Sequence, residues 1–128
     1  MAQIISSLHY ITQDNLVLSH VEQVKLALEG GIKWVQFRSK ILSEKDIRTE
    51  SLLINKLCKT YRATFILNDN WELAIELGLD GVHVGLTDTP ITEIRNYTDF
   101  IIGGTANSFD DVKLHFSAGA DYIGVGPF

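Results

Sequence analysis

Six short apolar segments recur along the chain, and each is apolar at consecutive positions rather than at alternating ones. Consecutive apolar residues are typical of strands that are covered on both faces, as in a parallel sheet. Polar residues follow several of these segments directly. The strands predicted in this way cover residues 8–12, 34–38, 64–67, 81–84, 100–103 and 122–126.

Between these segments the apolar residues recur at helical spacing. Residues 17–29 place Val21, Val24 and Leu28 on one face and end at Gly30-Gly31, which is a common way to stop a helix. Further helices are predicted at residues 45–61, 71–77, 91–97 and 109–118. A residue that can cap free backbone N–H groups precedes each helix, and these residues are Ser19, Ser43, Asn70, Thr89 and Ser108.

Regular alternation of strand and helix predicts parallel strands joined by right-handed crossovers. Two architectures fit this pattern, an open doubly wound sheet and a (β/α)₈ barrel. A complete barrel needs roughly 200 residues or more, so the 128 residues fit an open sheet better by length alone. However, the glycine-rich dinucleotide fingerprint is missing after the first strand, where Thr12-Gln13-Asp14-Asn15 stands instead. No linker interrupts the pattern, which predicts one domain over residues 1–128.

Composition and charge argue against several classes of partner. Hydrophobic residues make up 45% of the chain and charged residues 21%, as in ordinary soluble proteins. A net charge of −5 argues against nucleic acid as a main partner. Cys58 is the only cysteine, no apolar run is long enough to span a membrane, and the N-terminus lacks the pattern of a signal peptide. We therefore expect a cytoplasmic protein with no membrane partner.

The end of the second strand carries an unusual set of polar residues. With strand alternation, Gln36, Arg38 and Lys40 project to the same side of the sheet. Two cations that point inward together need an anion, and a polyphosphate would fit them. The alternative is a pair of cations that are solvated or paired with Asp or Glu.

The third strand ends at Asn68-Asp69, and Asp88 follows the fourth. If successive strands are neighbours, about 4.8 Å apart, the two carboxylates approach each other. A shared divalent cation would relieve their repulsion, and hard oxygen ligands suit Mg²⁺. The alternative is that Asp69 begins a helix and that Asp88 is a turn residue before Thr89-Pro90.

Two further segments carry candidate polar groups. His83 lies in the middle of the fourth strand, where it could orient Asp88 or a ligand, or be a hydrogen-bonded core histidine. After the fifth strand, residues 103–107 offer glycines that would let a ligand approach the backbone, together with a hydroxyl at Thr105 and an amide at Asn107. A plain strand-to-helix turn explains the same residues.

Taken in order, these motifs resemble the thiamine phosphate synthase family, and the resemblance covers essentially the whole chain. No single motif is decisive, but six occur in register. They are Tyr10-Ile11-Thr12, the segment from Gly31 to Lys40, Asn68-Asp69 with Leu73-Ala74, Asp80 to Gly85 with Asp88, Ile102 to Thr105, and Gly119 to Gly124 with Gly126-Pro127-Phe128.

The resemblance implies a (β/α)₈ barrel of TIM type, of which about six parallel strands and five helices are present. It implies a transferase that joins hydroxymethylpyrimidine diphosphate to a thiazole phosphate and releases diphosphate. The residues implied to bind the pyrimidine diphosphate are Gln36, Arg38, Lys40, Asn68, Thr105 and Asn107, of which Arg38, Lys40 and Thr105 would be catalytic. Asp69 and Asp88 are implied to hold Mg²⁺ as cofactor.

The chain departs from the family pattern in three places. Leu86 stands where glutamine is common and Asn107 where histidine is frequent. The chain also stops before the family's threonine-rich loop and the last two strands, so we expect the 128 residues alone to make no thiamine phosphate. An arc of six strands exposes two edges, which a homo-oligomer could cover. A related thiazole tautomerase and a non-catalytic phospho-ligand-binding fragment are the alternative functions.

Overall fold

The computed structural model describes residues 4–126, which form six strands and five helices in strict alternation. The strands are β1 (Tyr10–Ile11), β2 (Trp34–Phe37), β3 (Thr64–Asn68), β4 (Gly81–Val84), β5 (Ile101–Ala106) and β6 (Tyr122–Val125). The helices are α1 (His20–Glu29), α2 (Glu44–Tyr61), α3 (Trp71–Glu76), α4 (Ile91–Ile94) and α5 (Phe109–Ala118). Within this part of the chain, no helix combines the length and the apolar character needed to cross a membrane.

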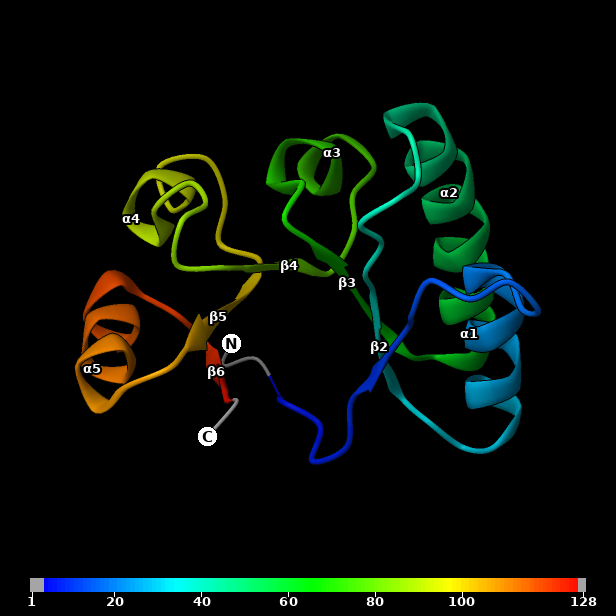
Figure 1. Cartoon of the computed structure of the whole chain (residues 1–128), viewed down its shortest axis with the longest axis horizontal. Helices are drawn as coiled ribbons and strands as arrows, with labels where there is room; N and C mark the ends of the chain where they lie inside the picture. The colour runs from blue at the N-terminus through cyan, green and yellow to red at the C-terminus, as the bar shows by residue number, and fades with distance from the viewer. Residues whose placement is uncertain (1–3, 127–128) are drawn as a thin grey trace.

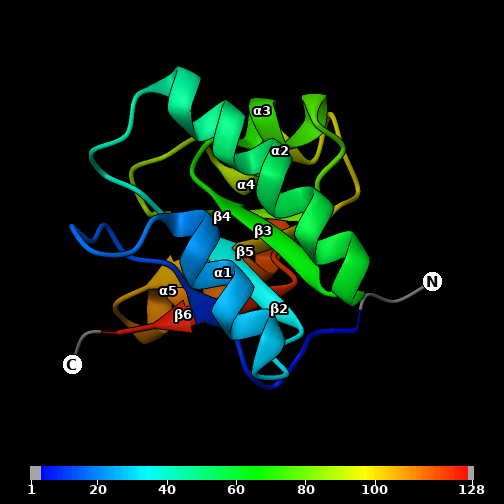
Figure 2. The same cartoon turned by 90° about the vertical axis from the view of Figure 1, so that its right-hand side faces the viewer.

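The six strands form one sheet in the order β1-β2-β3-β4-β5-β6, and every neighbouring pair is parallel. The sheet curls into an arc, and the helices lie along its outer side (Figure 1). Seen from the side, α1 and α2 lie in front of β2 and β3 (Figure 2). A doubly wound sheet would have helices on both faces. The arrangement confirms the TIM-barrel type, present as a curled half-barrel.

Both faces of the sheet are buried, which explains the consecutive apolar residues. Val35, Phe37, Phe65 and Leu67 belong to the core between the sheet and the helices. The alternate residues of the same strands point to the inside of the arc, where Trp34, Ile66 and Ile101 form a second buried cluster. The two-residue period of the strands therefore divides each apolar run between two cores.

Two aspartates before strands hold neighbouring strands in register. Asp80 precedes β4, and its Oδ2 accepts the backbone N–H of Phe65 in β3 at 2.8 Å. Asp121 precedes β6, and its Oδ2 accepts the N–H of Ile102 in β5 at the same distance and also pairs with Arg95. Both carboxylates lie at the end of the sheet opposite the predicted site, so their role is to fix the strands that carry it.

Most predicted boundaries agree with the structure within a few residues, and four of the five predicted caps are confirmed. Ser19, Ser43, Asn70 and Ser108 each accept a backbone N–H of the first helical turn. The prediction for Thr89 is wrong. Pro90 occupies the cap position of α4 without a side-chain hydrogen bond, and the Thr89 hydroxyl instead accepts the indole N–H of Trp71 at 3.2 Å.

Gly103 in β5 allows a close approach inside the arc. A Cβ atom built on Gly103 would lie 2.0 Å from the Cζ atom of the Tyr122 ring in β6. The ring therefore crosses over the glycine, and its hydroxyl reaches Nδ1 of His83 in β4 at 3.0 Å. The missing side chain lets β4 and β6 interact across the strand that separates them.

We predict that Gly103→Ala destabilises the protein by about 1–3 kcal/mol, because the added methyl group forces the Tyr122 ring out of its place. Thermal denaturation followed by circular dichroism measures the effect. Gly30→Ala is the matched control, since a Cβ there makes only ordinary contacts at 3.5 Å. Equal melting temperatures for wild type and Gly103→Ala would contradict the packing described.

Candidate active site

A cavity of about 260 Å³ opens at the carboxyl ends of the strands. Four predicted site residues line it together: Gln36 from β2, Asn68 from β3, Thr105 from β5, and Arg38 just after β2. They meet because neighbouring parallel strands end at the same edge of the sheet and because alternate residues face the inside of the arc. The remaining lining residues are Ile11, His83, Gly124, Val125 and Gly126.

A larger hollow of about 450 Å³ lies on the outer surface beside α2 and α3. Arg48 and Glu76 line it and form an ion pair with each other, which leaves neither charge free for a ligand. The smaller cavity is the better candidate site, because parallel α/β folds hold their ligands at the carboxyl ends of the strands.

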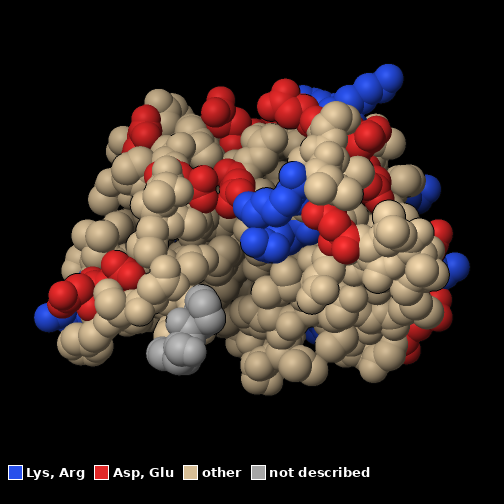
Figure 3. Space-filling model, viewed as in Figure 1, with Lys and Arg blue, Asp and Glu red and all other residues tan. Residues whose placement is uncertain are grey.

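The cations at the site differ in their partners. Arg38 is the only charged residue that lines the cavity, and within residues 4–126 its exposed guanidinium makes no ion pair or side-chain hydrogen bond. Lys40 extends to Asp69, where Nζ lies 3.1 Å from Oδ2. A small group of basic atoms lies near the centre of the molecular face with acidic atoms on either side (Figure 3). An anion could therefore bind Arg38 without breaking an existing ion pair.

Asp69 occupies a strained and partly buried position after β3. Its φ angle of 66° lies in the left-handed region, which is uncommon for residues other than glycine. Its backbone N–H is nevertheless held by the carbonyl oxygen of His83 at 2.8 Å. Burial raises the pKa of the Asp69 carboxyl, the ion pair with Lys40 opposes the rise, and the neighbouring Asp88 carboxyl adds to it.

Asp88 approaches Asp69 from the loop after β4. Its Oδ2 accepts the backbone N–H of Gly85 at 2.7 Å, which fixes the carboxylate at the end of the strand. Asp88 lies near enough to Asp69 to raise the pKa of its carboxyl. They form a pair and not a larger cluster: within the described residues, no group of three or more His, Cys, Asp or Glu side chains could hold a metal ion.

His83 faces the cavity and uses both ring nitrogens. Nε2 lies 2.9 Å from the Thr105 hydroxyl, and Nδ1 lies 3.0 Å from the Tyr122 hydroxyl. Burial, with smaller contributions from the nearby His115, His9 and Arg38, lowers the pKa of His83 to about 4. The ring is therefore neutral at pH 7. It is a hydrogen-bonded histidine at the floor of the cavity rather than a group that orients Asp88.

The structure places Asn107 and Leu86 away from the cavity lining. Asn107 is exposed just after β5, and its backbone N–H donates to the Asp111 carboxylate at 3.0 Å, as part of the turn into α5. Leu86 is exposed in the loop after β4. Thr105 lies within β5, whereas Asn107 lies beyond the end of β5 at Ala106, where the chain turns into α5.

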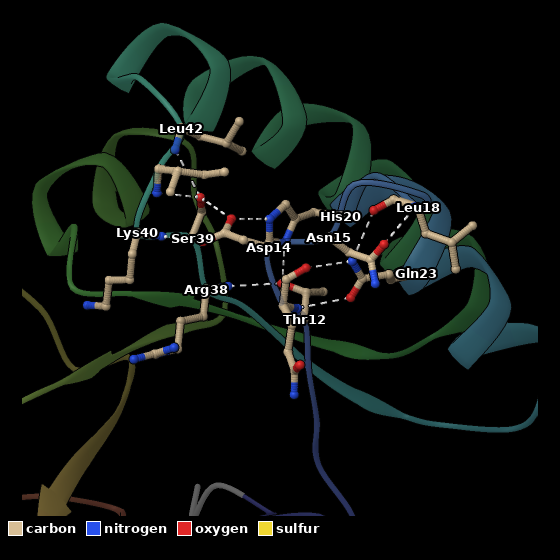
Figure 4. A network of polar contacts seen from close by, with 12 residues as sticks. Thr12, Asp14, Asn15, Leu18, His20, Gln23, Arg38, Ser39, Lys40 and Leu42 are labelled. Carbon is tan, nitrogen blue, oxygen red and sulfur yellow. Dashed lines mark hydrogen bonds and ion pairs between the residues drawn. The ribbon is translucent and has the colours of Figure 1, made fainter.

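Sequence reasoning missed the residues that hold the backbone around Arg38 and Lys40. Thr12 and Asp14, which follow β1, accept backbone N–H groups of Arg38 and Lys40, and His20 at the start of α1 is hydrogen-bonded to both of them (Figure 4). The one signal in the sequence is a run of polar residues after the first strand, at the same edge of the sheet as the other candidates.

The fold and the cavity define the class of protein: a TIM-barrel-type protein whose polar site lies at the carboxyl ends of parallel strands. The family model described as thiamine monophosphate synthase matches residues 8–128. The chain belongs to the thiamine monophosphate synthase family.

Individual relatives agree with this assignment. The chain is 50% identical to a thiamine-phosphate synthase of Bacteroides fragilis over 95% of its length and 61% of the relative's. It is 46% identical to that of Phocaeicola vulgatus over 94% of its length and 59% of the relative's. The solved structure of thiamine phosphate pyrophosphorylase from Pyrococcus furiosus matches with a TM-score of 0.86 and 30% identity, over 93% of this chain and 59% of that one. The chain spans about three-fifths of the length of these relatives.

We predict that Asp69→Asn raises the melting temperature at pH 7 when divalent cations are removed by a chelator. A carboxyl with a raised pKa favours the folded state while protonated, and this stability is lost as the pH rises through its folded pKa. Asparagine carries no charge, so it removes the free-energy cost of a partly buried carboxylate beside Asp88, and it tolerates the left-handed backbone. We expect a rise of about 1–3 °C, because solvent screens a partly exposed group.

The difference between variant and wild type should disappear below the ordinary carboxyl pKa of 3.8, where Asp69 is protonated in both the folded and the unfolded state. Melting curves between pH 3 and pH 8 measure it, with the exposed Asp99→Asn as control. A lower melting temperature for Asp69→Asn at pH 7 would show that the ion pair with Lys40 outweighs burial and repulsion.

Proposed function

We propose that this protein joins 4-amino-2-methyl-5-hydroxymethylpyrimidine diphosphate to 4-methyl-5-(2-phosphoethyl)thiazole, giving thiamine phosphate and diphosphate. The observation that carries the proposal is the grouping at one edge of the sheet. Two amides and an unpaired guanidinium line the cavity, and Lys40 lies nearby with a pair of carboxylates. The names of the relatives support the same reaction.

The reaction needs a site that stabilises a departing diphosphate rather than a protein nucleophile. The bond between the pyrimidine methylene carbon and the diphosphate oxygen breaks, and the electron pair leaves with the diphosphate. The thiazole nitrogen then captures the pyrimidine methyl cation and forms the new C–N bond. Positive groups placed where negative charge develops lower the barrier of such a step.

The cations would bind the diphosphate. Arg38 offers a planar set of N–H donors that fits two phosphate oxygens at once, and Lys40 would exchange its partner Asp69 for a phosphate. Gln36 and Asn68 would hydrogen-bond the pyrimidine ring deeper in the cavity. Thr105, held by His83 at 2.9 Å, would present its hydroxyl to the same substrate.

Asp69 and Asp88 fit a resident Mg²⁺. Burial and the repulsion between the two carboxylates raise the pKa of the Asp69 carboxyl. A divalent cation bound to both would offset this repulsion. Two carboxylates leave coordination positions open for phosphate oxygens and water, as Mg²⁺ prefers. When bound, the ion would neutralise charge on the leaving diphosphate.

We predict that Asp88→Asn reduces Mg²⁺-dependent turnover by about 100-fold or more, an effect typical of losing a group that stabilises charge in the transition state. Asparagine keeps an oxygen that can accept the Gly85 N–H, so the loop is preserved while the charge is lost. Thiamine phosphate formation by a full-length version of the protein, measured against Mg²⁺ concentration, provides the test, with the exposed Asp99→Asn as control. An unchanged Mg²⁺ dependence would refute the metal assignment.

Lys40→Ala is expected to weaken binding of the pyrimidine diphosphate by about tenfold, equivalent to roughly 1.4 kcal/mol, because a charge-assisted contact to phosphate is lost. Isothermal titration calorimetry with inorganic diphosphate and Mg²⁺ isolates this contact from the rest of the substrate. Lys45→Ala, which removes an exposed lysine at the start of α2, is the control. Equal affinities for Lys40→Ala and Lys45→Ala would exclude Lys40 from the site.

A further inference from the structure

The carboxylate of Asp14 binds the segment that carries the two cations. Oδ2 accepts the backbone N–H of Lys40 at 2.9 Å, and Oδ1 accepts the hydroxyl of Ser39 at 2.6 Å. Oδ1 also lies 2.9 Å from Nε2 of His20. These bonds hold the pKa of Asp14 at about 2, so the group is ionised throughout the physiological range.

A second set of bonds reaches the backbone of Arg38. The hydroxyl oxygen of Thr12 accepts the Arg38 N–H at 3.0 Å and lies 2.6 Å from Nδ1 of His20. A neutral His20 that carries its proton on Nε2 satisfies every group, because Thr12 then donates to Nδ1 and Nε2 donates to Asp14. Thr12 and His20 are buried, with 0% and 5% exposure, so these bonds exclude water.

The bonds form a closed ring from Arg38 through Thr12, His20 and Asp14 to Lys40 (Figure 4). The ring contacts only backbone N–H groups of Arg38 and Lys40. Their side chains point away from it on the same side (Figure 4). The Lys40 side chain ends at Asp69. The chain has left β2 at these residues and has not yet entered α2, so no strand or helix fixes their backbone.

We propose that Asp14 is a positioning residue, which sets the backbone of residues 38–40 so that Arg38 and Lys40 converge on the diphosphate. It acts directly on this segment and also through His20 and Thr12. The inference rests on the proposed function, since it assumes that these cations bind the substrate. Small displacements of positioned groups are costly to binding and catalysis, which is why supporting hydrogen bonds matter.

The test compares Asp14→Asn with Lys40→Ala in the intact protein. The amide has one acceptor oxygen where the carboxylate has two, so it cannot accept the Lys40 N–H on one side and the Ser39 and His20 donors on the other. We therefore expect the affinity for inorganic diphosphate with Mg²⁺ to fall about tenfold, within the range seen for residues that orient ligating groups. The KM for the pyrimidine diphosphate should rise in parallel. Asp121→Asn is the matched control, because its carboxylate also accepts a backbone N–H and a side-chain donor but lies at the opposite end of the sheet.

A double-mutant cycle separates positioning from general stabilisation. In an Arg38→Ala, Lys40→Ala background, adding Asp14→Asn should cause no further loss of diphosphate affinity, because no cation remains to be positioned. Thr12→Val, which keeps the shape and removes the hydroxyl, should weaken diphosphate binding in the same way and serves if Asp14→Asn fails to fold.

The outcomes are distinct. If Asp14→Asn and Thr12→Val lower the melting temperature as Asp121→Asn does and leave diphosphate affinity within about twofold, the ring is structural only and the inference is overturned. A loss that persists in full in the doubly substituted background overturns it as well. If Lys40→Ala itself leaves diphosphate affinity unchanged, the proposed function fails, and the positioning role fails with it.

Discussion

The structure depends on one constraint: a parallel sheet whose strands follow one another in space as they do in sequence and are buried on both faces. Because all strands run the same way, the residues that follow them gather at one edge. Because side chains alternate, half of each strand packs under the helices and the other half faces the inside of the arc. Gln36, Asn68 and Thr105 reach one cavity for this reason alone, although they come from three strands.

The same edge concentrates features that cost stability. The backbone of Asp69 is in the left-handed region. The pKa of its carboxyl is raised by burial and by the neighbouring Asp88. Strain and unfavourable charge in one place are typical of functional positions, where a ligand or an ion supplies the missing compensation. At the opposite end of the sheet, Asp80 and Asp121 accept strand N–H groups in ordinary geometry. The contrast separates the end that carries the proposed site from the end whose aspartates hold the strands in register.

Local patterns in the sequence were sufficient to predict the strands and helices and some of the residues that line the cavity. Apolar runs and helical spacing located six strands and five helices, and polar residues after strands led to Arg38, Asn68 and Asp69. Thr89 failed as a cap because Trp71, 18 residues away, binds its hydroxyl. The ring of Thr12, Asp14 and His20 was not predicted because it joins residues 26 positions apart, and no local pattern indicates such contacts. Asn107 lies outside the cavity lining because β5 ends at Ala106 and the chain turns there into α5, with the Asn107 N–H bound to the Asp111 carboxylate.

The cavity has two chemically different ends, and this division matches the proposed substrate. The floor holds His83, which burial keeps neutral with a pKa of about 4 and which binds the hydroxyls of Thr105 and Tyr122. Arg38 lines the cavity just after β2, and Lys40 and the two aspartates follow their strands at the same edge of the sheet. A ligand with a neutral ring and an anionic tail would place the ring toward the floor and the tail toward the edge, because the reverse would bury the diphosphate without cations. The direction in which the diphosphate departs, outward along the cations, would follow from this polarity.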